Sequence, residues 1–276
     1  VGDGGPDSQR ISAADFLRQE GIDTLDLLVL THLHRDHSGG LAKLLECVAV
    51  RSFRCNYLPD RIFWGKRVPV PEEFSARCLL ESLNVFLSAL AIMERQGTEI
   101  SLASPGTWPL TPELTAECFL EAQPIFERQA AIWQNVLEDR ADNRELEELD
   151  GFINNTSIRL RLSYAGQEIE LPGDVYASCW ERHQLPPCTL IKLPHHGHGD
   201  ALTSRLLEML RPRYAVISVS DDRTDDCPSK KIIQLLSQFG VECFFTDAVP
   251  CQYAPDQPHV AIRFRIEKGV LMVSDV

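Results

Sequence analysis

The sequence predicts a mixed α/β (α+β) fold, because segments typical of strands and of helices follow one another along the chain. Residues 27–30 form an apolar run bounded by polar residues, which is typical of a buried strand. Residues 156–164 alternate between apolar and polar side chains, which predicts a strand with two different faces. Residues 72–96 carry apolar side chains at helical spacing, which predicts an amphipathic helix that packs on a core.

The composition is that of a globular protein. The 276 residues suffice for one domain with a full core, and 44% of them are hydrophobic. The nine cysteines are scattered along the chain, which favours a reducing, cytoplasmic location over a disulfide framework. No apolar run long enough to cross a membrane stands out, so we expect no membrane partner. The net charge of −13 excludes a protein whose whole surface coats nucleic acid, although it allows a local basic groove.

A dense set of metal-binding residue types follows the first buried strand, in the sequence T-H-L-H-R-D-H-S-G-G at residues 31–40. Imidazole nitrogens and carboxylate oxygens are common ligands of zinc, manganese and iron. His32 and His34 lie two residues apart and can face one metal, while Asp36 and His37 can face a second. The alternative is a polar loop with surface histidines, which the spacing after a hydrophobic strand disfavours.

The segments around this motif are predicted as follows. Ser12 can cap a helix that runs to about Glu20, and a further helix covers residues 41–48. Residues 49–75 combine arginines with aromatic residues and prolines, so they are expected to form a loop. Arg54 and Arg61 in this loop are candidates for binding substrate phosphates, unless the loop is a solvated insertion whose aromatic residues pack on the core.

The middle of the chain is predicted to be a helical and basic insertion over residues 49–150 within a single domain of residues 1–276. Within it we expect strands at 99–102 and 114–120, a helix at 125–137, and a solvated helix end or mobile loop over the acidic residues 138–150.

A second polar cluster follows two later strands. The hairpin of residues 156–171 ends in Gly173-Asp174, and a buried strand at 189–193 runs into P-H-H-G-H-G-D at residues 194–200. The alternative for the latter is a glycine-rich polar loop. Beyond it the sequence predicts helices at 201–210 and 229–239, strands at 214–219 and 241–245, and a hairpin at 260–273.

The motif of residues 31–40 resembles the metal-binding signature of the metallo-β-lactamase fold superfamily. The resemblance implies a four-layer αββα sandwich with two divalent ions, zinc or manganese, at one edge between the sheets. It implies that Asp174 bridges the ions and that one of His195 and His196 binds metal while the other contacts the phosphate or donates a proton. Of the two, His195 is the predicted metal ligand. Asp3 in the opening glycine turn resembles an aspartate that supports the ligands, although it is also explained as an ordinary turn.

The motifs N-N-T-S, G-D and L-P-H-H-G resemble those of the metallo-hydrolase domain of ComEC-type competence proteins. This resemblance implies a nuclease or phosphodiesterase that uses a metal-bridging hydroxide. Its substrate would be nucleic acid or a nucleotide-like phosphodiester. Asp36, His195 and His196 would act in catalysis, and Lys192 would hold the substrate backbone.

The sequence departs from that branch or from the wider family at three positions. Asn155 stands where many members of the superfamily have a histidine ligand, which shifts the metal preference from zinc towards manganese. Cys227 stands where the branch has a histidine. We expect Cys227 not to bind metal, because nearby aspartates would raise the pKa of its thiol. His198 stands in place of a serine and could compensate.

Two other functions stay open. The same fold also supports hydrolysis of carbon esters, thioesters or lactams, because a fold does not decide a chemistry. Alternatively, Asn155 and Cys227 could mark a non-catalytic binding subunit of an assembly, with partner proteins that the sequence does not identify. The intact set of candidate ligands argues against a decayed metal site; it comprises His32, His34, Asp36, His37 and Asp174.

Overall fold

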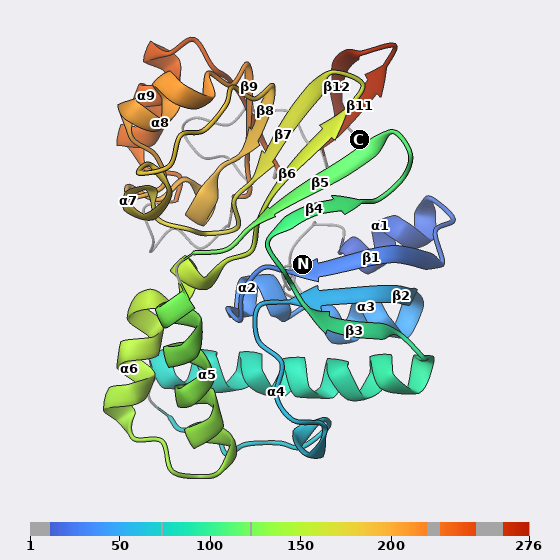
Figure 1. Cartoon of the computed structure of the whole chain (residues 1–276), viewed down its shortest axis with the longest axis vertical. Helices are drawn as coiled ribbons and strands as arrows, with labels where there is room; N and C mark the ends of the chain where they lie inside the picture. The colour runs from blue at the N-terminus through green and yellow to red at the C-terminus, as the bar shows by residue number, and fades with distance from the viewer. Residues whose placement is uncertain (1–11, 73, 122, 220–226, 247–261, 276) are drawn as a thin grey trace. The chain divides into compact units, whose positions relative to one another are not determined.

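The computed structural model describes residues 12–72, 74–121, 123–219, 227–246 and 262–275 (Figure 1). The chain folds into two compact units, the first from residues 1–103 and 122–158 and the second from residues 104–121 and 159–276. Helices and strands occur in both units, which confirms the predicted α/β class. The proposed insertion at 49–150 in a single domain stays a prediction; this segment contributes strands to the sheets of both units.

The first unit contains a three-stranded parallel sheet in the order β1-β2-β3, formed by β1 (Thr24–Leu30), β2 (Ala49–Cys55) and β3 (Glu99–Leu102). Strand β2 lies where the sequence predicted a loop. Its arginines suggested a loop. Arg51 is exposed, and its Nη1 donates across the sheet to Oδ1 of Asp26 on β1 at 2.6 Å. Arg51 and Arg54 thus lie on a strand whose other side chains include the buried Val50, Phe53 and Cys55.

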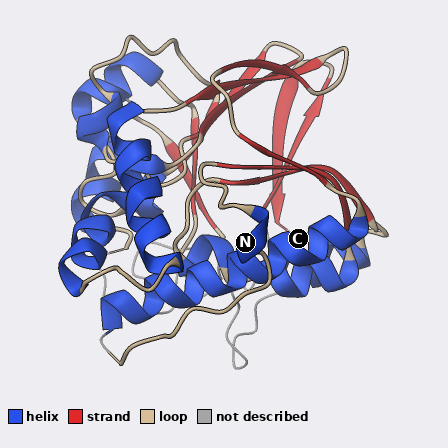
Figure 2. Ribbon diagram, turned by 60° about the horizontal axis from the view of Figure 1, so that its bottom comes forward, coloured by secondary structure: helices blue, strands red, loops and turns tan. Residues whose placement is uncertain are grey.

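The helices of the first unit pack on this sheet and on one another (Figure 2). Ser12 caps the first helix as predicted, because its Oγ accepts a hydrogen bond from the Asp15 amide at 3.2 Å. Of the acidic residues 138–150, which were expected in a loop or helix end, residues 138–142 form a turn and loop, whereas residues 143–150 lie in a helix capped by Asp142. The helices are α1 (Ala13–Gln19), α2 (Arg35–Ser38), α3 (Leu41–Cys47), α4 (Phe74–Gln96), α5 (Gln123–Leu137) and α6 (Asn143–Phe152), with 3-10 turns η1 (Arg61–Phe63) and η2 (Ile153–Thr156).

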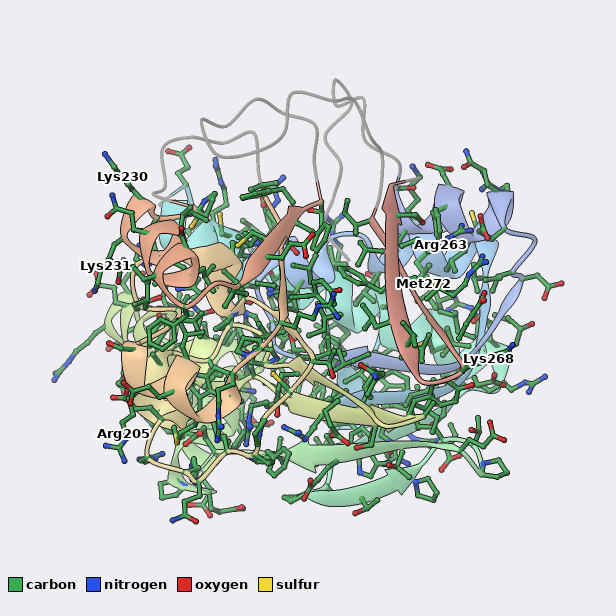
Figure 3. All side chains as sticks on the ribbon, turned by 90° about the horizontal axis from the view of Figure 1, so that it is seen from above. Arg205, Lys230, Lys231, Arg263, Lys268 and Met272 are labelled. Carbon is green, nitrogen blue, oxygen red and sulfur yellow. The ribbon has the colours of Figure 1, made fainter. Side chains whose placement is uncertain are left out.

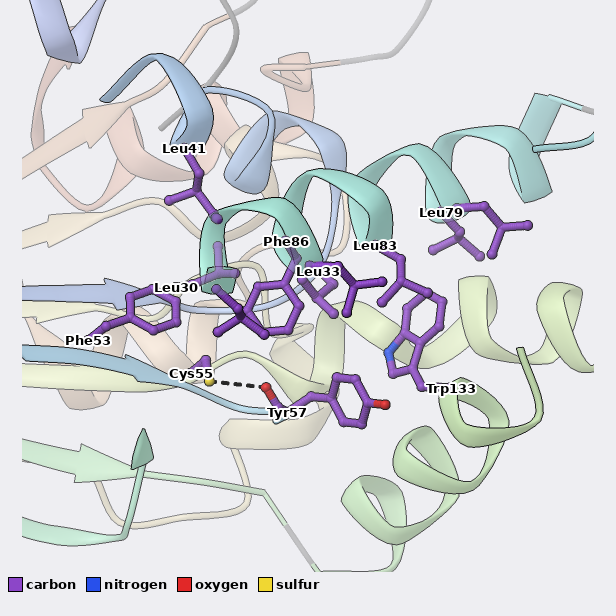
Figure 4. Close-up of a cluster of buried hydrophobic side chains, with 14 of the residues drawn as sticks. Leu30, Leu33, Leu41, Phe53, Cys55, Tyr57, Leu79, Leu83, Phe86 and Trp133 are labelled. Atoms are coloured by element: carbon purple, nitrogen blue, oxygen red, sulfur yellow. Dashed lines mark hydrogen bonds between the residues drawn. The ribbon is translucent and has the colours of Figure 1, made fainter. Parts of the chain in front are cut away.

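Helix α4 carries the core of the first unit. By length and apolar composition its segment Ala76–Gln96 could cross a membrane, contrary to the expectation from the sequence. However, 61% of its most apolar stretch is buried inside the protein. Figure 4 shows Leu79, Leu83 and Phe86 of α4 among the buried side chains of this core. The apolar surface of α4 is therefore explained by packing against the sheet and helices of its own unit.

Cys55, at the end of β2, is fully buried in this core (Figure 4). Its Sγ donates to the carbonyl oxygen of Tyr57 at 3.0 Å. Burial raises the pKa of the Cys55 thiol to about 12, because the charged thiolate would lose its hydration. The Tyr57 ring continues the cluster towards Trp133 of α5, with 6.3 Å between ring centroids.

The second unit contains a seven-stranded sheet in the order β10-β9-β8-β7-β6-β5-β4. Strands β4 to β7 pair antiparallel, whereas β7 to β10 pair parallel. The carboxyl ends of parallel strands meet at one edge of a sheet, so the segments that follow β7, β8 and β9 come together there. The strands are β4 (Gly106–Pro109), β5 (Leu114–Phe119), β6 (Arg159–Tyr164), β7 (Gln167–Leu171), β8 (Leu190–Lys192), β9 (Tyr214–Ile217) and β10 (Glu242–Phe245).

Helices α7 (Ala177–Trp180), α8 (Ser204–Leu210) and α9 (Lys230–Gln238) complete this unit, with the 3-10 turn η3 (Pro194–Gly197). The predicted terminal hairpin forms a separate two-stranded sheet from β11 (Ile262–Glu267) and β12 (Val270–Asp275). One face of the hairpin packs its apolar residues, including Leu271, on the seven-stranded sheet. The other face carries the exposed Met272, and Lys268 lies at its turn (Figure 3).

Candidate metal centre

In the first unit the carboxyl end of β1 runs directly into the predicted histidine motif. The rings of His32 and His37 have centroids 4.2 Å apart, and those of His32 and His34 have centroids 5.0 Å apart. Helix α2 starts after His34 and carries Asp36 and His37, whose Oδ2 and Nε2 atoms lie 3.2 Å apart. The turn therefore gathers three imidazoles and a carboxylate at one strand end, as the spacing predicted.

Two hydroxyl groups contact the innermost histidine, His32, which is fully buried. The Thr31 and Ser157 hydroxyl oxygens both lie 3.1 Å from Nδ1 of His32. Because these oxygens occupy the Nδ1 side of the ring, Nε2 is the nitrogen oriented for a metal. Ser157 was not among the residues predicted from the sequence, although its motif N-N-T-S was visible there.

The segment that carries Ser157 is docked beside the end of β1 by backbone and side-chain hydrogen bonds. The Ile158 amide donates to the Thr31 carbonyl at 3.0 Å, and Asn56 Nδ2 donates to the Thr156 carbonyl at 2.8 Å. Asn155 lies half-buried in the 3-10 turn η2 of this segment. The ligand role predicted for Asn155 stays a prediction, but its segment is fixed next to the histidine motif.

The predicted phosphate-binding arginines lie elsewhere in the first unit. Arg54 is a half-buried residue of β2. Arg61 starts the turn η1, where its Nη1 lies 3.4 Å from Glu94 Oε1 and its guanidinium lies 5.3 Å from the centre of the Trp64 ring. These contacts account for Arg61 without a substrate, and both roles stay predictions. Asp3 lies outside the described residues.

In the second unit Asp174 follows β7 and is almost fully buried, with 1% of the residue exposed. One carboxylate oxygen, Oδ1, accepts from Lys192 Nζ at 2.9 Å. The other, Oδ2, lies 3.4 Å from His196 Nε2. Lys192, which was predicted to hold substrate, therefore contacts the aspartate that was predicted to bridge the metals.

His196 is held by contacts at both ring nitrogens. Its Nδ1 lies 3.1 Å from the carbonyl oxygen of Ser218, which follows β9. A carbonyl can only accept a hydrogen bond, so Nδ1 carries a proton and Nε2 is the nitrogen that faces the Asp174 carboxylate. A histidine held in this way is arranged as a metal ligand.

His195 makes different contacts. Its Nδ1 lies 2.8 Å from Asp200 Oδ1, and its ring packs near His198 and Tyr176, with centroid distances of 4.9 and 5.4 Å. Of the two adjacent histidines, His195 was predicted from the sequence as the metal ligand, and that role stays a prediction. Within this unit the geometry favours His196 for that role.

The backbone of this turn is strained. His195 and His196 have φ values of 46° and 52°, in the left-handed region that residues with a Cβ rarely adopt. Such conformations cost about 1–3 kcal/mol each and persist only where the fold holds them, often at functional sites. Gly197, the next residue, packs closely against Pro228. A Cβ added at Gly197 would lie 3.1 Å from Cβ of Pro228, so a larger residue would not fit without a shift.

Cys227 precedes that proline and is half-buried, with its Sγ 4.0 Å from the His195 carbonyl oxygen. This weak contact leaves the role of Cys227 a prediction. The aspartates on which that prediction relied lie outside the described residues; they are Asp221, Asp222, Asp225 and Asp226.

Each unit thus presents imidazole nitrogens and carboxylate oxygens with their orientation fixed by hydroxyl, carbonyl or ammonium groups. Such mixed nitrogen and oxygen donor sets suit zinc, manganese or iron. The residues present therefore fit divalent metal ions.

Comparison with known proteins agrees with this chemistry. The family model described as "Metallo-beta-lactamase superfamily" matches residues 3–220. ComE operon protein 3 of Bacillus subtilis (strain 168) is 23% identical over 236 residues, which are 84% of this chain and 25% of that protein. The chain therefore spans about a quarter of the length of this relative.

Two solved structures show weaker similarity. A provisionally assigned metal-dependent hydrolase from Parabacteroides distasonis ATCC 8503 has a TM-score of 0.43 at 12% identity, covering 81% of this chain and 77% of that one. An isothiocyanate hydrolase from Delia radicum gut bacteria has a TM-score of 0.41 at 14% identity, covering 80% of this chain and 73% of that one. Because the family model covers most of the sequence, and in agreement with the resemblance predicted from its motifs, the chain belongs to the metallo-β-lactamase superfamily.

Proposed function

We propose that this chain is a metal-dependent phosphodiesterase that cleaves nucleic acid or a nucleotide-like phosphodiester. The observation that carries the proposal is His196, whose protonated Nδ1 faces a carbonyl while Nε2 faces the buried carboxylate of Asp174. Membership of the metallo-β-lactamase superfamily supports the metal-dependent part. The resemblance to ComEC-type proteins, seen in three motifs of this sequence, supports the phosphodiester part.

The proposed ligands come from both units, as the family signature implies. His32 and His34 would bind one divalent ion, and Asp36, His37 and His196 a second, with Asp174 shared between them. When bound, two such ions would lower the pKa of water to near 7 and neutralise charge that develops on a phosphate. Asn155 would add an oxygen ligand and favour manganese over zinc.

Lys192 has a positioning role in this proposal. It holds Oδ1 of Asp174 at 2.9 Å and so directs Oδ2 towards His196. A carboxylate fixed by a hydrogen bond outside the metal shell binds metal more tightly than a mobile one. Lys192 therefore orients a ligand, and Arg54 and Arg61 remain the proposed contacts for the substrate phosphates.

The proposed setting is the cytoplasm. The nine cysteines are scattered along the sequence and form no C-x-x-C pair, which supports a reducing compartment. Hydrolysis of carbon esters, thioesters or lactams, and a non-catalytic role in an assembly, are the competing functions that the assays below separate.

The test is the variant Asp36→Ala, assayed with bis-p-nitrophenyl phosphate and with single- and double-stranded DNA in the presence of manganese. Half of the Asp36 side chain is exposed, so its loss should change the free energy of unfolding by no more than about 0.5 kcal/mol. Phosphodiester cleavage should be abolished while the melting temperature stays nearly constant.

Asp26→Ala is the matched control, since Asp26 is an exposed aspartate of the same unit that pairs with Arg51. It should keep full activity. An active Asp36→Ala protein would exclude the proposed mechanism. Hydrolysis of nitrocefin or of a thioester without phosphodiester cleavage would assign the second function, and wild-type protein without any hydrolysis would favour the binding subunit.

A further inference from the structure

We propose that His195, His198 and Asp200 form a separate zinc site in the second unit, distinct from the proposed catalytic metals. Each of the three side chains offers one ligand atom, and these atoms lie within 4.8 Å of one another. Two imidazoles and one carboxylate are a common three-residue set for zinc, which completes its shell with water. The inference does not depend on which substrate the protein hydrolyses.

The distances fit a zinc ion. Zinc bonds of about 2.0–2.2 Å in a tetrahedral shell place neighbouring ligand atoms about 3.3 Å apart. His198 Nδ1 lies 3.2 Å from Asp200 Oδ1, and His195 Nδ1 lies 2.8 Å from the same oxygen. A zinc ion would therefore require His195 Nδ1 and Asp200 Oδ1 to move apart by about half an ångström.

His198 supplies an independent observation. Its Nδ1 is buried and makes no hydrogen bond with any residue that the structure describes, although Asp200 Oδ1 lies nearby at 3.2 Å. Buried polar atoms are satisfied in most proteins, so a buried nitrogen that lies beside a carboxylate without a hydrogen bond to it indicates an additional partner. A divalent ion between the nitrogen and the carboxylate would satisfy both.

The backbone fixes the three residues before an ion binds. The His198 amide donates to the His195 carbonyl at 2.8 Å, and the Ala201 amide donates to the His198 carbonyl at 2.9 Å. The Asp200 carbonyl accepts from the Ala177 amide at 2.9 Å. A ligand set held in place in this way loses little conformational entropy when it binds an ion.

The three proposed ligands are accessible to solvent, and their combined charge favours a cation. The side chains of His195, His198 and Asp200 are 25%, 41% and 39% exposed, so an ion and its water can reach them. Two neutral imidazoles and one carboxylate give a net charge of −1, which attracts a dication.

The test counts zinc ions in the full chain. The protein is loaded with zinc, freed from excess ion by dialysis, and analysed by elemental mass spectrometry, with cobalt absorption spectra as a second readout. His198→Ser and Asp200→Asn should each bind one zinc ion fewer than the wild type and lose the corresponding cobalt signal. His183→Ser is the matched control, since His183 is a half-exposed histidine of the same unit, and it should bind the wild-type number.

Equal zinc content in the wild type and both variants would overturn the separate site. A loss of two or more ions in His198→Ser, or a loss of phosphodiester cleavage together with its single ion, would also overturn it by placing His198 in the catalytic centre. If the wild type cleaves no phosphodiester but the variants still lack one ion, only the proposed function fails. The two proposals are thus tested separately.

Discussion

Ser157 lies buried in the first unit, with its hydroxyl oxygen 3.1 Å from Nδ1 of His32. The two residues are 125 positions apart in the chain, so only folding brings them together. A hydroxyl at this position fixes the orientation of the ring, and Thr31 provides a second hydroxyl at the same distance. Ser157 therefore acts through His32 as a positioning residue.

Ser157→Ala should weaken metal binding about 10-fold or more, because mutation of a group that orients a metal-bound histidine typically costs 10–100-fold in affinity. Removal of one hydrogen bond should lower the free energy of unfolding by about 1 kcal/mol. The affinity is measured by competition with a chelating dye, and the stability by urea denaturation of the metal-free protein.

Ser82→Ala is the control for this change. Ser82 is equally buried in the first unit, but its hydroxyl donates to the Cys78 carbonyl at 2.7 Å. It should lose similar stability and keep its metal affinity. Equal affinities in the two variants would show that Ser157 is only a packing residue.

At the scale of secondary-structure elements, strands β6 and β7 place charged residues inside the second unit. Arg161 is 6% exposed and donates from Nη1 to Glu170 Oε1 at 2.8 Å and from Nε to Glu168 Oε2 at 2.7 Å. Burial lowers the pKa of Arg161, but the hydrogen bond and charge of Glu170 outweigh burial and leave that pKa above its ordinary value. The charged guanidinium is therefore stabilised by its partners.

Arg161→Gln should destabilise the protein by about 3 kcal/mol, because it leaves the buried carboxylate of Glu170 without its main hydrogen-bond donor. The measurement is urea unfolding at pH 7. Arg265→Gln on β11 removes an exposed arginine that lies 3.5 Å from Glu267, and should cost less than about 1 kcal/mol. Similar losses in both variants would mean that the buried network adds nothing to stability.

Strand β6 also shows what the sequence could and could not predict. Its alternation correctly predicted a strand, and placed Arg159 and Arg161 on the face opposite Leu160. Alternation says nothing about partners, however. Arg159 is covered by the Phe119 ring at 4.1 Å and by the Trp180 ring at 5.5 Å, which come from distant parts of the chain. The burial of these arginines therefore could not be predicted from local pattern.

The same dependence on contacts between distant residues explains which other features were predicted and which were missed. The apolar run before His32 predicted β1 and the histidine turn, because strand and ligands are adjacent in sequence. Strand β2 was missed because its arginines resembled a solvated loop, while its pairing with β1 and β3 is a tertiary property. The choice of His196 beside Asp174 required the position of the Ser218 carbonyl, which no local pattern contains.

At the scale of the whole molecule, each unit is assembled from separate stretches of chain. The first unit combines residues 1–103 with 122–158, so the chain passes between the units three times. The proposed metal ligands are likewise divided, with the histidine motif in one unit and Asp174 and His196 in the other. If both sets bind the same ions, as we propose, metal binding must stabilise the two units together.

Two buried thiols can be used to test whether metal binding stabilises both units. Burial raises the pKa values of Cys55 in the first unit and Cys188 in the second to about 12 each. Both thiols are therefore protonated and protected at pH 8 in the folded protein, and a thiol reagent reacts with them only after unfolding. The rate at which each cysteine is labelled, followed by mass spectrometry of its peptide, measures the opening of its unit.

Manganese at about 100 times its dissociation constant should stabilise the native state by about 2.7 kcal/mol, which corresponds to about 100-fold slower labelling. If the ions are shared as proposed, we expect this slowing at both Cys55 and Cys188, because the opening of either unit would then release them. In Asp174→Asn, which alters a ligand in the second unit only, the protection should be reduced at both thiols alike. Protection of Cys188 with unchanged labelling of Cys55 would contradict a shared metal centre and would leave the histidine motif of the first unit without its proposed partners.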